Sequence, residues 1–259
     1  MKAAKKLLYN LLCNKLTGWF ILFIFKDNIP DIRWKGYVYN LRKANMRQST
    51  IASIFWGFYE STEIRFVEKY FKGNMDVLEL GGSCGVVTSH LVSKLDKNKR
   101  LISVEANSDL QIIFKENTQR HNNNSVEIIL INKAIHYEDD TVTFYISSNT
   151  TESSALNKID TKSNTVQIPA VTVGNIIDIY RLNEYILVCD IEGTEIQVFL
   201  NEKSSLKFCK AIIIEFHDTI YNGILYSTEH LRDIVRSKGF VLIENYGHVH
   251  YFEQLTNNS

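Results

Sequence analysis

Apolar and polar positions follow two different periods along most of the chain after Tyr59. Short, nearly continuous apolar runs predict strands that are buried on both faces, and longer amphipathic stretches between them predict helices. The predicted helices cover residues 60–71, 86–95, 110–120 and 230–238, and the predicted core strands cover residues 76–80, 101–105, 126–131, 185–190 and 211–216. Strands that take turns with helices in this way are typical of βαβ units and a parallel sheet.

Two parts of the pattern differ from this alternation. Residues 141–146 and 165–171 alternate between apolar and polar side chains over most of their length, which predicts two strands of an insertion. Residues 240–244 and 249–253 flank a short polar turn, which is the composition of a hairpin. The fold class we expect is therefore α/β, a doubly wound, mostly parallel sheet with a C-terminal antiparallel hairpin.

We expect residues 1–58 to form a basic and apolar extension with helical patterning and residues 59–259 to form the main domain. The whole chain has no net charge, but residues 1–47 carry ten basic and two acidic side chains, so the remainder has an excess of eight negative charges. The apolar run 16–25 is shorter than the ~20 residues of a membrane-spanning helix. A basic amphipathic helix on the inner membrane face is one interpretation of residues 1–26, and packing against the main domain is the other.

Cysteine and proline usage adds two expectations. The four cysteines are scattered without a Cys-x-x-Cys pair, which is typical of reduced cysteines in a cytosolic protein, so we expect a cytoplasmic location. With two prolines and no low-complexity stretch, the sequence shows no linker between independent domains.

The turn after the first core strand is the leading candidate for a ligand site. Residues 76–85 read DVLELGGSCG, a buried strand that runs into glycines and then a helix. Glycines at such a turn allow close approach of a nucleoside ligand, and the helix start offers free N–H groups. Glu79, at the end of the strand, can meet a cationic amino group directly or through water.

A second acid strengthens this interpretation. Glu105 ends the next core strand, 20 residues beyond Gly85, where a carboxylate can accept both hydroxyls of an adenosyl ribose. A dehydrogenase would use a related turn and acid, but the dinucleotide pattern G-x-G-x-x-G is absent. The Tyr-x-x-x-Lys pattern of short-chain dehydrogenases occurs only at Tyr39 to Lys43, before the turn.

A third acidic segment follows a later core strand. Residues 190–195 read DIEGTE, which places Asp190 at the carboxyl edge of the sheet, beside the crevice where such folds bind ligands. Three acids in six residues are rarely part of a core. Capping of the following helix is the alternative role, and it suits Glu195 better than Asp190.

These motifs together resemble the FkbM family of S-adenosylmethionine (SAM)-dependent O-methyltransferases, across nearly all of residues 59–252. The residues that carry the resemblance are the E-x-G-G-x-x-G turn, Val104 to Asn107, Asn132 to Ile135, Ser153 and Ser154, the D-x-E-G-x-E block at Asp190, and Ile214 to His217. Family members often have Asp at the position of Glu79, Pro at Ala106 and Lys at Val188, so this chain lacks one positive charge near the crevice.

The resemblance implies a class I methyltransferase fold, which is Rossmann-like, and a SAM cofactor. It implies that Glu79, Gly81, Gly85 and Glu105 contact the cofactor. It also implies that the segment from Asn132 to Ala134 lies near the adenine, with Asn132 and Ala134 as the contacting residues. The acceptor that it implies is a sugar hydroxyl of a bacterial surface polysaccharide, a glycolipid or a natural product. We expect a small-molecule or glycan acceptor and no nucleic acid.

Methyl transfer to a hydroxyl needs an aligned acceptor and benefits from a base. Asp190 and His217, at the ends of two core strands, are the candidate bases, with Asp190 preferred, and we expect Glu192 and Glu215 to contact the acceptor. Asp190, Glu215 and His217 could instead gather a divalent cation, although no spacing demands one and we assign no metal ligands. A non-catalytic adenosine-binding module is a further alternative.

Overall fold

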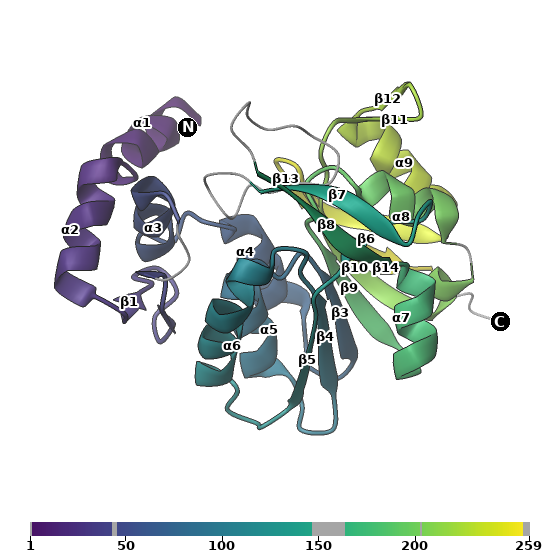
Figure 1. The fold of residues 1–259 in the computed structure, drawn as a ribbon, viewed down its shortest axis with the longest axis horizontal. Coiled ribbons are helices and arrows are strands. Elements are labelled where there is room, and N and C mark those ends of the chain that lie inside the picture. The colour runs from purple at the N-terminus through teal and green to yellow at the C-terminus, as the bar shows by residue number, and fades with distance from the viewer. Residues whose placement is uncertain (1, 43–45, 147–163, 203, 256–259) are drawn as a thin grey trace.

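The computed structural model describes residues 2–42, 46–146, 164–202 and 204–255. Its centre is a seven-stranded sheet in the order β13-β14-β10-β9-β3-β4-β5 (Figure 1). The strands are β3 (Asp76–Leu80), β4 (Arg100–Val104), β5 (Glu127–Ile131), β9 (Tyr185–Cys189), β10 (Cys209–Glu215), β13 (Phe240–Tyr246) and β14 (Val249–Gln254). The neighbouring strands β5, β4, β3, β9 and β10 are parallel, and β14 runs antiparallel to both β10 and β13. The predicted doubly wound, mostly parallel sheet with a C-terminal antiparallel hairpin is confirmed.

Helices cover both faces of this sheet, as the continuous apolar strands require. One layer contains α4 (Ser61–Tyr70), α5 (Val86–Lys94) and α6 (Gln111–Arg120), and the other contains α7 (Val173–Tyr180), α8 (Glu195–Asn201) and α9 (Thr228–Ser237). Neighbouring residues of one strand serve different layers, since Val77 packs into the core below α4 to α6 and Leu78 into the core below α7 to α9. Each predicted helix and core strand is present, with ends shifted by one or two residues.

Smaller elements lie between these. The predicted insertion forms a three-stranded sheet of β6 (Ala134–Ile135), β8 (Asn164–Val171) and β7 (Thr141–Ile146). A hairpin of β11 (Thr219–Tyr221) and β12 (Ile224–Tyr226) and two 3₁₀ turns (Ser108–Leu110 and Ser205–Phe208) were not predicted. Ser153 and Ser154, which contribute to the family resemblance, lie outside the described residues.

The N-terminal extension is helical and packs beside α5 and α6. It contains α1 (Lys2–Leu12), α2 (Lys15–Phe25), β1 (Ile29–Pro30), β2 (Val38–Tyr39) and α3 (Gln48–Phe55). The Tyr37 ring stacks on the His90 ring of α5 with centroids 3.6 Å apart, and the Asn40 N–H donates to Asn117 Oδ1 of α6 at 2.7 Å. Buried residues of the extension belong to the same core as α4 to α6. Thus the extension is part of one packed body with the sheet.

Within the described residues, no single helix has the length and hydropathy of a membrane span. The segments Lys6–Leu12 and Lys15–Phe25 meet that standard only together, and they are bent by 52° relative to each other.

Candidate active site

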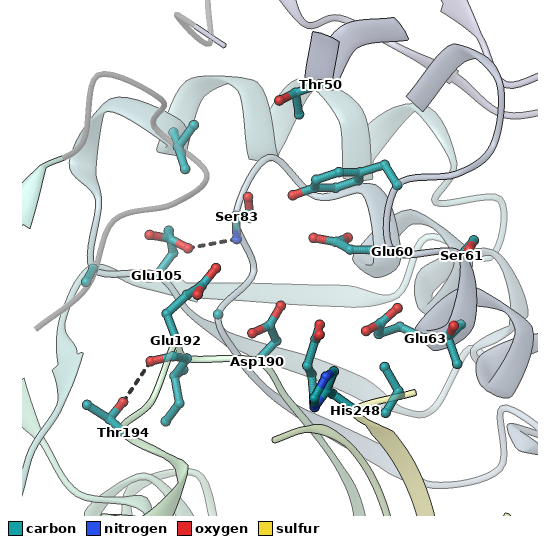
Figure 2. A pocket seen from close by; sticks show the side chains of 18 of the residues that line it. Thr50, Glu60, Ser61, Glu63, Ser83, Glu105, Asp190, Glu192, Thr194 and His248 are labelled. Carbon is teal, nitrogen blue, oxygen red and sulfur yellow. Dashed lines mark hydrogen bonds between the residues drawn. The ribbon is translucent and has the colours of Figure 1, made fainter. Parts of the chain in front are cut away.

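A cavity of about 480 Å³ opens at the carboxyl ends of the parallel strands (Figure 2). Its wall contains the turn after β3, the segments that follow β4, β5 and β9, the last residue of β10 and the turn between β13 and β14. The start of α4 and four residues of the extension, Tyr9, Thr50, Ser53 and Phe58, close the other side. In the sheet order, β3 lies next to β9. The chain continues from β3 toward one edge of the sheet and from β9 toward the other, and doubly wound folds bind ligands at such a point.

The glycine turn is fixed by its contact with β9. Gly81 has a φ of 89°, which favours glycine, and a Cβ at this position would lie 1.8 Å from the Asp190 carbonyl oxygen. The Asp190 N–H donates to the Leu80 carbonyl at 2.9 Å, so the two strand ends are joined directly. Gly85 has a φ of 79° and stands at the N-cap of α5. The turn and Asp190 are therefore positioned by one local structure.

Substitution Gly81→Ala tests this coupling. We expect a loss of about 3 kcal/mol or more of unfolding free energy, because both the backbone conformation and the Asp190 contact become unfavourable. The corresponding fall in melting temperature is about 6 °C or more. Gly223→Ala is the matched control, since Gly223 also has a positive φ of 76° but a Cβ there meets no atom within 4 Å. Equal shifts for the two variants in a thermal melt would contradict the coupling.

Glu79 lies beneath the turn. Its carboxylate is buried and accepts hydrogen bonds from Thr88 Oγ1 and from Ser103 Oγ, the latter at 2.6 Å. Burial raises the pKa of Glu79 to about 7, although these two hydroxyls oppose the shift. The side chain contributes to a small cavity of about 20 Å³ and does not line the large one. Through these hydrogen bonds, Glu79 joins α5 to β4 next to the glycine turn.

Glu105 faces the large cavity from the end of β4. Its carboxylate accepts hydrogen bonds at 2.7 Å from the Ser83 N–H of the glycine turn and from the Asn107 N–H. Burial raises its pKa, and these two bonds oppose the shift. The Asn132 amide donates to the carbonyl oxygens of Glu105 and Ala106, and Ala134 lines the cavity itself. Asn132 thus positions the Glu105 segment.

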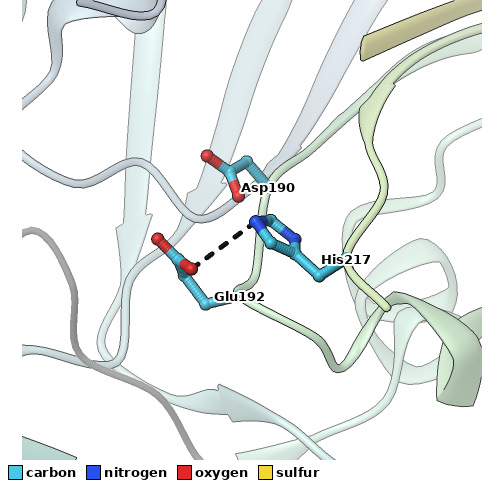
Figure 3. Close-up of side chains that lie close together, drawn as sticks. All are labelled: Asp190, Glu192 and His217. Carbon is cyan, nitrogen blue, oxygen red and sulfur yellow. Dashed lines mark ion pairs between the residues drawn. The ribbon is translucent and has the colours of Figure 1, made fainter. Parts of the chain in front are cut away.

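The D-x-E-G-x-E block and His217 form one polar network. Glu195, fully buried at the start of α8, accepts hydrogen bonds from the Ile191 and Gly193 N–H groups. The same oxygen lies 3.0 Å from His217 Nδ1, and His217 Nε2 lies 3.5 Å from Glu192 Oε2 (Figure 3). Glu195 therefore orders the turn that carries Asp190 and Glu192 and fixes the orientation of the imidazole.

Charge in this network favours a protonated imidazole. Burial alone would lower the pKa of His217, but the carboxylates of Glu195, Asp190 and Glu192 outweigh it and raise that pKa to about 10. Burial, with the nearby Glu215 and Glu192 carboxylates, raises the pKa of Asp190 well above its ordinary value, while His217 opposes the shift. Asp190 Oδ1 is buried and has no hydrogen-bond partner among the described residues.

The candidate metal ligands that lie close together in the structure differ from those that the sequence suggested. Among the described residues, the candidate ligand atoms that lie within 4.8 Å of one another belong to Asp190, Glu192 and His217, and Glu215 is not in this group. Both ring nitrogens of His217 already face carboxylates. We assign no metal to this group.

Two acids of the cavity wall were missed by the sequence analysis. Glu60 and Glu63 lie at the start of α4 and point into the cavity together with Asp190 (Figure 2). Burial raises the pKa of Glu60 to about 8 and that of Glu63 well above its ordinary value. Residues 60–71 resemble any amphipathic helix, so only the packing of α4 against the sheet ends could identify these acids.

The residues present fit a SAM molecule. The cavity is large enough for a nucleoside ligand, and Glu105 supplies carboxylate oxygens at the end of the second core strand. Gly81 has no side chain, so the turn can lie directly against the backbone of Asp190 in the cavity wall, where a Cβ would collide. Acidic walls also suit the sulfonium and ammonium charges of SAM.

Comparison with known proteins found several solved structures that are similar to the chain. Solved structures similar to the chain include magnesium protoporphyrin IX methyltransferase from Synechocystis PCC 6803 with bound SAM (9% identity, TM-score 0.44, 80% of this chain and 83% of that chain). Others are ribosomal protein L11 methylase from Lactobacillus delbrueckii subsp. bulgaricus (9%, 0.42, 75% and 78%) and a putative RNA methyltransferase from Pyrococcus horikoshii (10%, 0.42, 78% and 85%). No curated protein sequence matches the chain.

A family model gives the assignment. The model of the methyltransferase FkbM domain matches residues 83–242, from the glycine turn to the first strand of the C-terminal hairpin. Because this match spans more than half of the chain, the protein belongs to the FkbM family of SAM-dependent methyltransferases.

Proposed function

We propose that the protein transfers a methyl group from SAM to a hydroxyl oxygen of a sugar, in a bacterial surface glycan or glycolipid. The observation that carries this proposal is that the glycine turn, Glu105 and Asp190 open into one cavity. This arrangement offers a nucleoside site and a strand-end carboxylate side by side. Family membership argues against the dehydrogenase alternative.

The residues of the cavity have separate roles in this proposal. SAM, when bound, supplies an electrophilic methyl group on a sulfonium. Glu105 accepts hydrogen bonds from the ribose hydroxyls, Gly81 and Gly85 shape the turn along the ligand, and Ala134 contacts the adenine. Glu79 acts from below by holding the turn.

Asp190 is the group that we assign as the base. His217 opposes the rise of the Asp190 pKa and so favours the ionised carboxylate, which can receive the proton of the acceptor hydroxyl as the new C–O bond forms. His217 is less suited to this role, because the surrounding carboxylates keep it protonated at neutral pH. We assign His217 to orienting and electrostatically balancing Asp190 and Glu192.

Glu192 and Glu215 are available to the acceptor on the same side of the cavity. Carboxylate oxygens are good acceptors for the several hydroxyl donors of a sugar. Six carboxylates contribute to the wall, at positions 60, 63, 105, 190, 192 and 215. Such a wall would repel the phosphates of a nucleic acid, which supports a glycan acceptor.

The experiment for this proposal follows the methyl group. The purified protein, incubated with methyl-labelled SAM and a glycolipid or polysaccharide fraction, should place label in alkali-stable material that yields an O-methyl sugar after acid hydrolysis. Label released by alkali would indicate a carboxyl ester instead, and label on nucleic acid or protein would contradict the proposed acceptor.

We further propose that residues 1–26 rest on the inner face of the cytoplasmic membrane. The helices α1 and α2 expose several large apolar side chains, among them Leu7, Leu11, Leu16, Trp19, Phe20 and Phe23. These helices lie in the basic part of the chain, so an anionic bilayer complements both their charge and their apolar surface. The described cysteines are all free and buried, which supports a reducing compartment.

The extension also contributes to the proposed site. Tyr9 of α1 lines the cavity, so the helix that would contact the membrane borders the space where the acceptor should enter. We therefore propose that residues 1–58 form a membrane-directed extension and residues 59–259 the catalytic domain. A lipid-linked sugar suits this arrangement.

Membrane association predicts a measurable change. The double variant Leu16→Glu, Phe23→Glu, at positions that are 80% and 69% exposed, should partition at least about tenfold less onto vesicles that contain phosphatidylglycerol. The control variant Ile220→Glu, Leu225→Glu changes two residues of similar exposure in the β11–β12 hairpin and should partition like the wild type. Equal binding by both variants, or loss of a dimer in sedimentation velocity as the only effect, would contradict the proposal.

A further inference from the structure

Of the two acids at the start of α4, Glu60 is hydrogen-bonded to Tyr59, but Glu63 has no partner among the other described residues that explains its burial. Glu63 is only 5% exposed, and in the described part of the chain no other residue donates a hydrogen bond to its side chain. Its carboxylate points into the cavity (Figure 2). A buried polar group is normally hydrogen-bonded, and a buried charge is normally paired. Among the described residues, the protein therefore supplies no other residue as a partner for the Glu63 carboxylate.

Other carboxylates surround Glu63. Burial is the largest cause of its raised pKa, and Glu215, Glu60 and Asp190 add to it through their negative charge. Glu215 is the last residue of β10, and Asp190 follows the adjacent strand β9. Four acids from three elements thus meet on the side of the cavity opposite Glu105.

Positive charge near this group is scarce among the described residues. Lys133 lines the cavity but follows β5, four strands away from β10, which corresponds to about 19 Å at ordinary strand spacing. His217 faces Asp190 and is already paired with Glu195 and Glu192. His248 of the hairpin turn is the remaining basic group in the wall. Among the described residues, the protein therefore supplies little positive charge to these carboxyl groups.

Glu60 reaches the cavity by an unusual backbone conformation. It has a φ of 44° and a ψ of 29°, in the left-handed region that residues with side chains rarely adopt. It stands at the N-cap of α4, where an acid would ordinarily accept a hydrogen bond from the helix N–H groups, yet it makes no such bond. The side chain is directed to the cavity instead (Figure 2).

The spread of these carboxylates argues against a metal ion as their partner. Among the described residues, Glu60, Glu63 and Glu215 belong to no group of three whose ligand atoms lie within 4.8 Å of one another. An ammonium group has three N–H donors and can bridge carboxylates that are farther apart than the ligands of one small cation.

We propose that Glu60, Glu63 and Glu215 form a binding site for an organic ammonium group beside Asp190. The inference rests on the proposed function and specifies its ligands. The ammonium has two chemical sources, the amino group of the SAM methionine moiety or an amino group on the acceptor sugar. In the first case these acids take the role that the sequence analysis gave to Glu79, and in the second the acceptor is an amino sugar.

Calorimetry on the full chain tests the site in two arms. The donor arm compares S-adenosylhomocysteine (SAH) with S-(5′-deoxyadenosyl)-4-thiobutyrate, which differs from it by the missing amino group. The acceptor arm titrates glucosamine and N-acetylglucosamine into protein saturated with SAH. Each arm uses the wild type, Glu63→Gln and the control Glu184→Gln, which removes an exposed acid just before the opposite end of β9.

We expect the amino compound to bind the wild type about tenfold or more tightly than its partner in one arm, and Glu63→Gln to abolish that preference. The arm that responds identifies the source of the ammonium. An absence of preference in both arms, or preferences that survive Glu63→Gln, would overturn the proposal, as would binding of Mg²⁺ alone that Glu63→Gln removes. SAH binding by the wild type supports the proposed function in every case, and its absence would count against that function first.

A fold check accompanies these titrations. Removing an uncompensated buried carboxylate should leave the melting temperature of Glu63→Gln equal to or above that of the wild type. If it is lower, Glu60→Gln is measured in the same two arms, and the same criteria apply to it.

Discussion

Substitution Asp190→Asn is expected to lower kcat for methyl transfer by about 10²- to 10⁴-fold, the usual contribution of a positioned general base. The amide keeps the size of the side chain, but it cannot accept the proton of the acceptor hydroxyl. The affinity for SAH should change by less than about twofold, because Glu105 and the glycine turn are intact. Steady-state kinetics with labelled SAM and calorimetry with SAH measure the two quantities.

The control for this variant is Glu184→Gln, which removes an acid from the amino side of the same strand and should leave kcat unchanged. Full turnover by Asp190→Asn would contradict the assignment of a base at this position. A parallel loss of SAH affinity would show that Asp190 holds the cofactor and not the acceptor.

Substitution Glu105→Ala is expected to weaken SAH binding by about 10- to 100-fold, since hydrogen bonds to a charged group are worth about 1.5–3 kcal/mol. The variant also leaves the Ser83 and Asn107 N–H groups without their acceptor. A ribose contact makes a specific prediction: the wild type prefers adenosine over 2′,3′-dideoxyadenosine, and Glu105→Ala loses that preference.

The isosteric variant Glu105→Gln separates geometry from charge and should fall between the wild type and Glu105→Ala. Retention of the adenosine preference in Glu105→Ala would place the ribose elsewhere in the cavity.

The sequence predicted the central sheet well because its strands are short apolar runs bounded by clear turns. The strand Asp76–Leu80 and the hairpin of β13 and β14 lie where the pattern placed them. The helices α7 and α8 were missed for physical reasons. Both are short, and in α8 the residues from Glu195 to Phe199 are all buried, so no polar face gives a helical period.

The site was predictable where function depends on strand ends. Glu105 and Asp190 could be placed because the carboxyl ends of parallel strands share one edge of the sheet. Glu60 and Glu63 could not, since their position depends on how α4 packs across that edge. The hydrogen bonds of Glu79 to Thr88 and Ser103 also depend on tertiary packing, which a linear pattern does not contain.

The role of Glu195 illustrates the same limit. Its place in the sequence suits a helix cap, and it does stand at the start of α8. The structure shows that it accepts hydrogen bonds from N–H groups before the helix and pairs with His217 of the next strand end. A contact over 22 residues of sequence between two strand ends needs the sheet order to be known.

The most direct test of the account is calorimetric titration of the purified protein with SAH and, separately, with NAD. We expect saturable binding of SAH with one site per chain, a clear loss of affinity in Glu105→Ala, and no binding of NAD. Binding of NAD in preference to SAH, or SAH binding that Glu105→Ala leaves unchanged, would contradict a SAM site on the turn from Glu79 to Gly85.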